Sequence, residues 1–392
     1  MQGRRVAVTG IGVVAPCGIG TDAYWDGLLR LAEPGERRVD DFDPGPWFGP
    51  KEARRTDRFA QFAVAAAAMA LDDAGKLTAN PERRGVIIAT GVGGLETLET
   101  QILVHHQKGA NRVSPFLVPM MMANAGAAAV SMRFGWQGPC ETITTACAAG
   151  THAIGAGARL VAAGTCDAVL AGGSEAAITP VALAGFGNMT ALSGRGVSQP
   201  FDVNRDGFVM AEAAAVLVLE ELSAAEARGA RVYAELLGSA STADAHHITA
   251  PEPSGSGAVR CMELAIADAG MSPDAIRHIN AHGTSTPLND AAEGVAINKV
   301  FGAPGPPVTS TKGVTGHALG AAGALEAAAV VLSIDRALIP PTMGTEQVDP
   351  QIELDVVLGE PRPWEPGPAL SNSFGFGGHN GCLVIAPPQS SA

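Results

Sequence analysis

Short apolar runs bounded by glycine alternate with longer alanine-rich stretches of helical length, and this alternation constrains the fold more than any other feature. In the first half of the chain, the predicted strands are 6–9, 86–90 and 168–171, and the predicted helices are 58–73 and 148–163. A strand, helix, strand order is typical of an α/β protein with a covered sheet. The pattern therefore predicts a mostly parallel sheet rather than a sandwich or a bundle.

The alternation continues to the end of the chain, and the second half resembles the first. The further strands are predicted at 215–219, 232–238 and 276–280, and the further helices at 223–228, 256–269, 290–300 and 318–334. No low-complexity linker separates the halves. We therefore expect one fold with an internal division near residue 230, into an N-terminal half 1–230 and a C-terminal half 231–392.

Composition disfavours several classes of protein. The net charge of −13 disfavours nucleic-acid phosphates as a partner. The longest apolar run, 62–71, is too short to span a membrane, and Gly10 and Gly12 interrupt the first apolar stretch where a signal peptide needs a continuous helix. The six cysteines show no CxxC pairs and no metal-ligand spacing, so we expect no metal site, no disulfides and a cytoplasmic location.

One cysteine lies in a setting that favours reactivity. The segment 142–150, TITTACAAG, places Cys147 between β-branched residues and a run of small residues. This pattern predicts a strand, a turn at Cys147 and then a helix, an arrangement that resembles a nucleophile elbow. The positive end of the helix dipole would stabilise the thiolate and lower the pKa of Cys147. A buried structural cysteine is the alternative interpretation.

Three further segments are rich in glycine and hydroxyl side chains and follow plausible strands. They are 280–290 (NAHGTSTPLND), 310–317 (STKGVTGH) and 372–380 (NSFGFGGHN). A single histidine in such a loop is more often a hydrogen-bonded structural residue than a catalyst. The three segments together with Cys147 nevertheless predict a catalytic site that includes His282 and His317.

In this order, the four segments resemble the motifs of the elongating β-ketoacyl-acyl carrier protein synthases of the thiolase superfamily, close to the synthase II type. The resemblance covers nearly the whole chain and includes 6–12, 205–208, 244–247 and 340–342. It implies an α/β, thiolase-like duplicated five-layer αβαβα fold. It also implies an acyltransferase that lengthens an acyl chain by two carbons in fatty acid or polyketide biosynthesis.

The resemblance assigns roles to the main site residues. Cys147 takes an acyl group from the phosphopantetheine of an acyl carrier protein and yields it to the carbanion formed when malonyl-acyl carrier protein loses carbon dioxide. The backbone N–H groups of Cys147 and Phe376 form the oxyanion hole. Neutral His282 and His317 donate Nε2–H bonds to the malonyl thioester oxygen. No bound cofactor is implied, because phosphopantetheine arrives on the carrier protein.

Other residues are expected to support the site or contact the substrate. Lys312 is expected near His317 and in contact with Glu326, where the pair would orient the histidine. Phe376, between two glycines, matches the gate of the acyl pocket, and a second loop, 244–249, would move with it. The substrate-contacting residues are then Thr284 and Thr286 for pantetheine, and Phe374, Val92, Leu117, Asp244, His247 and Thr249 for the acyl chain and the loops.

A carrier protein is acidic, as this chain is, so docking requires a basic surface. The matching positions are Lys51, Arg54, Arg55 and Arg112. Asn111 and Gln199 stand where basic residues are common in the family, and Gly313 stands where serine is usual. These departures suggest a pathway-dedicated enzyme and slight repacking near the active site.

Several alternatives stay open at this point. The chain is expected to form a homodimer, or to be the catalytic ketosynthase subunit of a heterodimer with a chain-length-factor-like partner. A biosynthetic thiolase would need a second catalytic cysteine near the C-terminus, whereas Cys382 lies in a predicted strand. A cysteine-histidine hydrolase would give a product without added carbons. A dinucleotide-binding protein is disfavoured, because Gly10 and Gly12 are not followed by the third glycine of that fingerprint.

Overall fold

The computed structural model describes residues 1–389. The main sheet consists of two five-stranded halves. They meet where the last strand of the first half, β1, pairs with the first strand of the second half, β7. The first half has the order β4 (Cys140–Glu141), β3 (Arg84–Ala89), β5 (Ala168–Glu175), β6 (Ala213–Glu221), β1 (Val6–Ala15). The second half has the order β7 (Ala234–Ala243), β13 (His379–Ala386), β12 (Ala369–Gly375), β8 (His278–Asn280), β9 (Val308–Thr309). Outside this path, β2 (Gly18–Ile19) pairs with β1, and β10 (Leu338–Ile339) pairs with β11 (Arg362–Pro363).

The two halves have the same topology. Counted outward from their junction, β1, β6, β5, β3 and β4 correspond to β7, β13, β12, β8 and β9. Each pair of neighbours in one half has the same relative direction as its counterpart in the other. This repetition is the duplication that the sequence resemblance implies, while a division at residue 230 stays a prediction.

The sheet is mixed, so the prediction of a mostly parallel sheet is wrong. The outer strands β3, β4 and β5 are parallel, as are β8, β9 and β12, but the strands around the junction are antiparallel. Connections determine these directions: β12 reaches β13 through the short turn 376–378, which permits only antiparallel pairing. Hydrophobic periodicity carries no information about strand direction.

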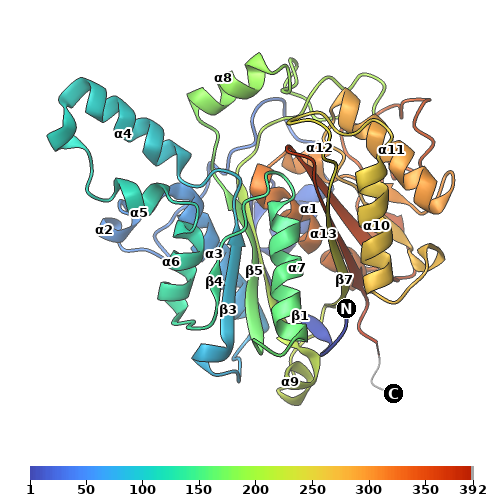
Figure 1. The fold of residues 1–392 in the computed structure, drawn as a ribbon, viewed down its shortest axis with the longest axis horizontal. Helices are drawn as coiled ribbons and strands as arrows, with labels where there is room; N and C mark the ends of the chain where they lie inside the picture. Colours follow the sequence, from blue (N-terminus) through green and yellow to red (C-terminus); the bar gives the residue numbers. More distant parts are fainter. Residues whose placement is uncertain (390–392) are drawn as a thin grey trace.

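Helices cover both faces of each half and complete five layers. The central helices α7 (Ala149–Ala162) and α13 (Ala322–Arg336) contact strands of both halves. On the outer faces, α3 (Arg58–Ala74) packs on the first half, and α10 (Ser256–Asp268), with α11 (Pro287–Phe301) beside it, packs on the second. Figure 1 shows this α, β, α, β, α order from left to right across the body of the molecule.

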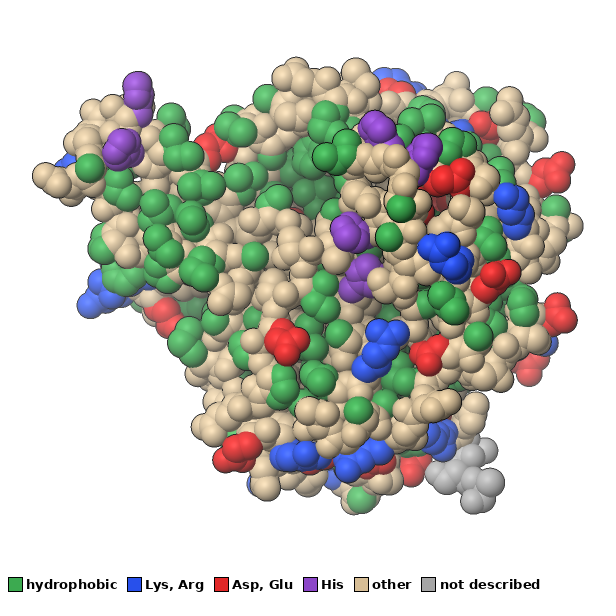
Figure 2. Space-filling view, in the orientation of Figure 1, with side chains coloured by type: hydrophobic (Ala, Val, Ile, Leu, Met, Phe, Trp, Pro, Cys, Tyr) green, Lys and Arg blue, Asp and Glu red, His purple; other side chains and the backbone are tan. Residues whose placement is uncertain are grey.

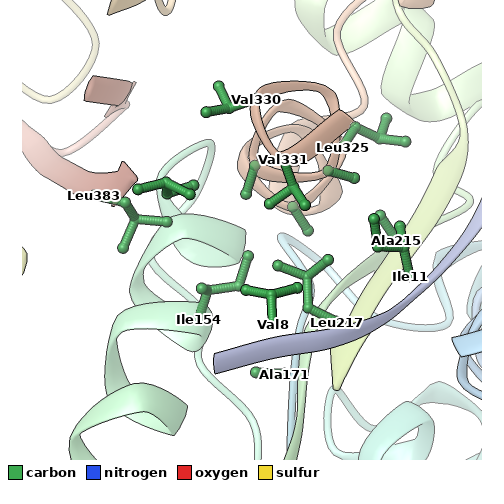
Figure 3. Close-up of a cluster of buried hydrophobic side chains, with 14 of the residues drawn as sticks. Val8, Ile11, Ile154, Ala171, Ala215, Leu217, Leu325, Val330, Val331 and Leu383 are labelled. Carbon is green, nitrogen blue, oxygen red and sulfur yellow. The ribbon is translucent and has the colours of Figure 1, made fainter. Parts of the chain in front are cut away.

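Successive residues of the central strands enter different cores. Leu217 of β6 packs with α7 and α13, whereas Val216 and Val218 pack with α3. Figure 3 shows the core between the two halves, where Ile154 of α7 and Val331 of α13 gather with side chains of β1 and β6. Burial on both faces explains why these strands are continuous apolar runs without polar alternation.

The remaining helices flank the five layers. They are α1 (Thr21–Leu28), α2 (Pro50–Ala53), α4 (Leu95–Lys108), α5 (Leu117–Met121), α6 (Ala125–Phe134), α8 (Pro180–Asn188), α9 (Leu222–Ala227) and α12 (Lys312–Thr315). Helices α4 and α5 project from the body, and α4 has no buried side chain (Figure 1). Within residues 1–389, no helix is long and apolar enough to cross a bilayer.

Candidate active site

A cavity of about 460 Å³ lies where loops from both halves meet, and it brings the predicted catalytic residues together. Cys147 reaches it from the loop before α7, His282 from the loop after β8, and His317 from the loop after α12. Phe376 lines it from the turn between β12 and β13. Figure 2 shows a hollow with apolar walls beside α8, which supplies part of the lining.

Cys147 lies just before the N-terminus of α7, but its setting differs from the prediction in two respects. The strand expected to lead into it is absent, since β4 ends at Glu141 and the residues up to Cys147 form a loop in which Ala146 has a φ of 50°. The side chain is only 7% exposed, and burial raises the pKa of the thiol to about 11. The charge of Lys312 and a hydrogen bond from the Phe376 backbone N–H oppose this rise without cancelling it.

The two histidines face each other edge to face, with ring centroids 5.4 Å apart. Burial, together with the nearby positive charge of Lys312, holds the pKa of both well below the usual value, so both are neutral. The Nδ1 atom of His282 lies 3.4 Å from Lys312 Nζ. The His317 ring meets the edge of Phe208 at 5.2 Å, and its Nδ1 has no hydrogen-bond partner among the residues that the structure describes.

Lys312 and Glu326 form a buried ion pair, as the sequence led us to expect. Lys312 Nζ also donates a 2.6 Å hydrogen bond to the backbone oxygen of His282. Burial raises the pKa of Glu326 to about 7, and Lys312 is the largest opposing influence. The pair therefore supports His282 directly, whereas the sequence analysis expected it beside His317.

Two carboxylates of α11 hold the His282 loop in place. Glu293 accepts hydrogen bonds from the backbone N–H groups of His282 (2.7 Å) and Gly283 (2.8 Å). Asp290 accepts one from the N–H of Thr284 at 3.0 Å. The hydroxyls of Thr284 and Thr286 lie 2.9 Å apart, and both residues line the cavity, where they are placed to contact a substrate.

An aromatic cluster forms the wall of the cavity near Phe376. The Phe376 ring lies 6.4 Å from that of Phe186, which in turn meets the edge of Phe208 at 5.4 Å. Phe374 lines the cavity as well and packs on His282. Phe186 and its neighbour Met189 were missed by the sequence analysis, because apolar residues in a short helix look like ordinary core residues.

The second predicted loop, 244–249, contacts the Phe376 turn. Asp244 donates its backbone N–H to Gly378 O at 2.9 Å and accepts a 2.7 Å hydrogen bond from the side chain of Asn380. Asp244 and Thr249 line the cavity. His247 does not line it; this side chain is exposed and accepts hydrogen bonds from the next turn of the same loop.

Of the other predicted residues, one lines the cavity and the rest lie outside it. Val92 lines the cavity, whereas Leu117 lies on the projecting α5 and does not reach the cavity of its own chain. The four predicted docking residues are exposed, and Arg55 stacks on Phe116 with its guanidinium carbon 4.3 Å from the ring centroid. Residues 1–389 contain no group of three or more histidine, cysteine, aspartate or glutamate side chains suited to a metal ion.

Comparisons with known proteins agree with this geometry. Family models of the β-ketoacyl synthase match residues 32–225 with its N-terminal domain and residues 233–346 with its C-terminal domain. A curated relative, 3-oxoacyl-(acyl-carrier-protein) synthase 2 of Synechocystis sp., is 45% identical over 414 aligned residues, which span 99% of each chain.

Two solved structures superpose on nearly the whole chain. The ishigamide ketosynthase/chain length factor gives a TM-score of 0.93 at 34% identity, over 99% of this chain and 100% of the other. AntDE:AntF, a type II PKS acyl-carrier protein in complex with its ketosynthase bound to the hexaketide, gives 0.89 at 33% identity, over the same shares of the two chains. With its cysteine and two histidines gathered in one cavity, the chain belongs to the β-ketoacyl synthase family.

Proposed function

We propose that the protein condenses an acyl group held on Cys147 with malonyl-acyl carrier protein, which releases carbon dioxide and gives a β-ketoacyl-acyl carrier protein two carbons longer. The observation that carries the proposal is the single cavity shared by Cys147, two neutral histidines and Phe376. The name of the curated relative, a 3-oxoacyl synthase that acts with acyl carrier protein, supports the same reaction class.

In the first half-reaction, the Cys147 sulfur attacks the thioester carbon of the acyl-phosphopantetheine. The carbonyl oxygen becomes an oxyanion, which the backbone N–H groups of Cys147 and Phe376 stabilise. When the oxyanion collapses, the bond to the phosphopantetheine sulfur breaks, and that sulfur takes up the proton that Cys147 lost. The acyl chain then occupies the apolar part of the cavity beside Phe186 and Val92.

In the second half-reaction, a malonyl thioester replaces the released carrier. The neutral imidazoles of His282 and His317 donate hydrogen bonds to its thioester oxygen while the bond to the carboxylate breaks and carbon dioxide leaves. The resulting enolate carbon attacks the acyl-Cys147 thioester, and the Cys147 sulfur departs with the electron pair and takes up a proton from water, which restores the thiol. Because Lys312 Nζ faces His282 Nδ1, that nitrogen accepts and the proton lies on Nε2, the form that can donate.

Each step uses a group of this chain or the phosphopantetheine of the carrier, so the proposed reaction requires no resident cofactor. The carrier would dock on the exposed basic residues named above, and the small number of these residues favours a dedicated carrier. Reduced, unpaired cysteines throughout residues 1–389 suit the cytoplasm, where we place the reaction.

A second candidate is that the chain is the catalytic subunit of a heterodimer. The observation that favours it is the projecting α4–α5 arm, which exposes Ile102, Leu103 and Val118. A ketosynthase/chain length factor is among the solved structures that superpose on the chain, and a second copy of this chain would cover the same arm in a homodimer. Sedimentation of the protein alone distinguishes the two, because a stable homodimer leaves no free arm for a different partner.

The test uses acyl-carrier proteins of graded chain length and malonyl-carrier protein, with products followed by intact mass spectrometry. We expect an acyl mass on the wild type and a β-ketoacyl product two carbons longer. Cys147→Ala should never be acylated, whereas the matched control Cys140→Ala, which removes an exposed cysteine, should behave as the wild type. A wild type that hydrolyses the acyl thioester without adding carbons would refute the condensation and support a hydrolase.

A further inference from the structure

His152, in the first turns of α7, bonds to two segments that the proposed mechanism uses. Its Nδ1 lies 2.7 Å from the hydroxyl of Thr145, two residues before Cys147. Its Nε2 lies 3.0 Å from the backbone oxygen of Asn380, which follows the Phe376 turn on β13. A carbonyl oxygen can only accept, so Nε2 carries the proton and Nδ1 accepts from the Thr145 hydroxyl. Burial lowers the pKa of His152, which favours this neutral form, so the ring bridges the two segments.

The oxyanion hole depends on the relative position of these two segments. One of its N–H groups belongs to Cys147 and the other to Phe376, and the two residues come from different halves of the fold. The segments are in tight contact: a Cβ on Gly375 would lie 3.0 Å from the Cys147 nitrogen and 3.0 Å from the Thr145 oxygen. A shift of the Cys147 loop relative to β12 and β13 would therefore separate the two donors.

The same bridge continues into the second loop of the cavity. The side-chain amide of Asn380 donates to Asp244 at 2.7 Å, and the Asp244 backbone N–H donates to Gly378 O at 2.9 Å. The His152 ring also packs against the β13 backbone, because a Cβ on Gly381 would lie 3.0 Å from two of its ring atoms. The position of the Cys147 loop is thus linked to the 244–249 loop and to the Phe376 turn, which both line the cavity.

We infer that His152 is a positioning residue that holds the Cys147 and Phe376 N–H groups at the separation the acyl-transfer oxyanion requires. The inference rests on the proposed function, since it concerns the oxyanion of that acyl transfer. His152 does not line the cavity and so does not touch the substrate. Complete loss of one oxyanion-hole donor typically lowers the rate by about 10²–10³-fold, which sets the upper limit for misplacing one.

The test compares two reactions of the same thiol. Acylation by octanoyl-N-acetylcysteamine passes through an oxyanion, whereas alkylation by iodoacetamide does not. Both rates are measured at Cys147 by peptide mass mapping, with alkylation of the exposed Cys140 as an internal reference. The variants are His152→Ala, which removes both bonds, His152→Gln, whose amide can still donate to Asn380 O, and Thr145→Val, which removes only the hydroxyl.

We expect the acylation rate to fall by about 10–100-fold in His152→Ala and by about 10-fold in Thr145→Val, which is within the limit set by loss of a whole oxyanion-hole donor. The rate of His152→Gln should lie between those of the wild type and His152→Ala. Alkylation of Cys147 should fall much less than acylation, because it needs no oxyanion hole and is sensitive only to the effect of the Phe376 N–H on the pKa of the thiol. Equal losses in both reactions, or unchanged acylation, would overturn the inference. If His152→Ala does not fold, Thr145→Val, which keeps the ring, decides the question alone. A wild type that is alkylated but never acylated would instead overturn the proposed function.

Discussion

Replacement of Lys312 by methionine separates the electrostatic role of this residue from its packing. Lys312 and Glu326 are each only 1% exposed, so Lys312→Met leaves a buried carboxylate without its cation. Removing one partner of a buried pair costs about 3–5 kcal/mol. With 392 residues and about 2.1 cal/mol/K of unfolding entropy per residue, 1 kcal/mol corresponds to about 1.2 °C, so Tm should fall by about 4–6 °C.

The loss should depend on pH in a defined direction. Burial already raises the pKa of Glu326 to about 7, and removal of the ammonium raises it further. A carboxyl whose folded pKa exceeds its unfolded value stabilises the fold below the unfolded pKa and loses that contribution as pH rises. The Tm difference between Lys312→Met and the wild type should therefore be larger at pH 8.5 than at pH 6.

Scanning calorimetry, together with an assay of malonyl-thioester decarboxylation, tests both roles. The double variant Lys312→Met/Glu326→Leu should regain most of the lost Tm, because no unpaired buried charge remains. Its decarboxylation rate should stay about 10–100-fold below that of the wild type, because His282 still lacks the cation that keeps its proton on Nε2. Arg231→Met, which breaks an exposed ion pair, should lower Tm by about 1 °C or less. Full recovery of decarboxylation in the double variant would refute the electrostatic role of Lys312.

Three further predictions concern pH and packing. Alkylation of Cys147 by iodoacetamide should rise about tenfold per pH unit from pH 7 to 10, because burial raises the pKa of this thiol to about 11; a plateau below pH 9 would contradict that burial. His278 is buried, and neither of its ring nitrogens has a hydrogen-bond partner within residues 1–389. Burial lowers its pKa to about 3, so the protein should lose stability as pH falls below about 6.5, by about 1.4 kcal/mol per pH unit. His278→Leu should lose less Tm than the wild type between pH 7.5 and pH 5, and an equal loss would disprove this. Gly313→Ala should lower Tm, since its Cβ would lie 1.8 Å from Met343 O. Gly185→Ala should not, because its Cβ would meet no atom within 4 Å among residues 1–389, apart from the backbone of its own helix. Equal Tm values for the two variants would count against the tight contact at Gly313.

Periodicity in the sequence predicted the elements that form the layers, for a physical reason. Helix 58–73 was predicted within a residue or so of α3, because burial against one sheet face leaves a long apolar run. Strand direction was not predictable in this way, since β6 and β13 look the same whichever way they run. Helices α4 and α8 were not predicted either, because neither has a buried side chain to impose a pattern.

The chemistry of the site was predictable from the sequence where it depends on residue type. It was not predictable where it depends on how deeply a side chain is buried and on how the loops pack. The four motifs correctly indicated that Cys147, His282 and His317 would meet, and their catalytic roles stay predictions. The sequence predicted Lys312 near His317, which its charge does influence, but it did not predict the direct contacts of Lys312 Nζ with His282, because these depend on how two loops from adjacent strands pack. His152 was missed because both of its partners, a threonine hydroxyl and a backbone oxygen, are common in any loop.

Burial favours catalysis by the two histidines of this cavity and opposes catalysis by the cysteine. Desolvation keeps His282 and His317 neutral, which is the form that donates to a developing enolate, and it keeps Cys147 protonated, which is the form that does not attack. Lys312 affects both kinds of group, because its positive charge lowers the pKa of the two histidines and also the pKa of the Cys147 thiol. The decarboxylation step therefore finds its groups in the required state at neutral pH, whereas acyl transfer must first ionise a buried thiol. Above about pH 8, where Glu326 is already ionised, any further pH dependence of the whole cycle should accordingly arise in the acylation of Cys147 and not in the condensation.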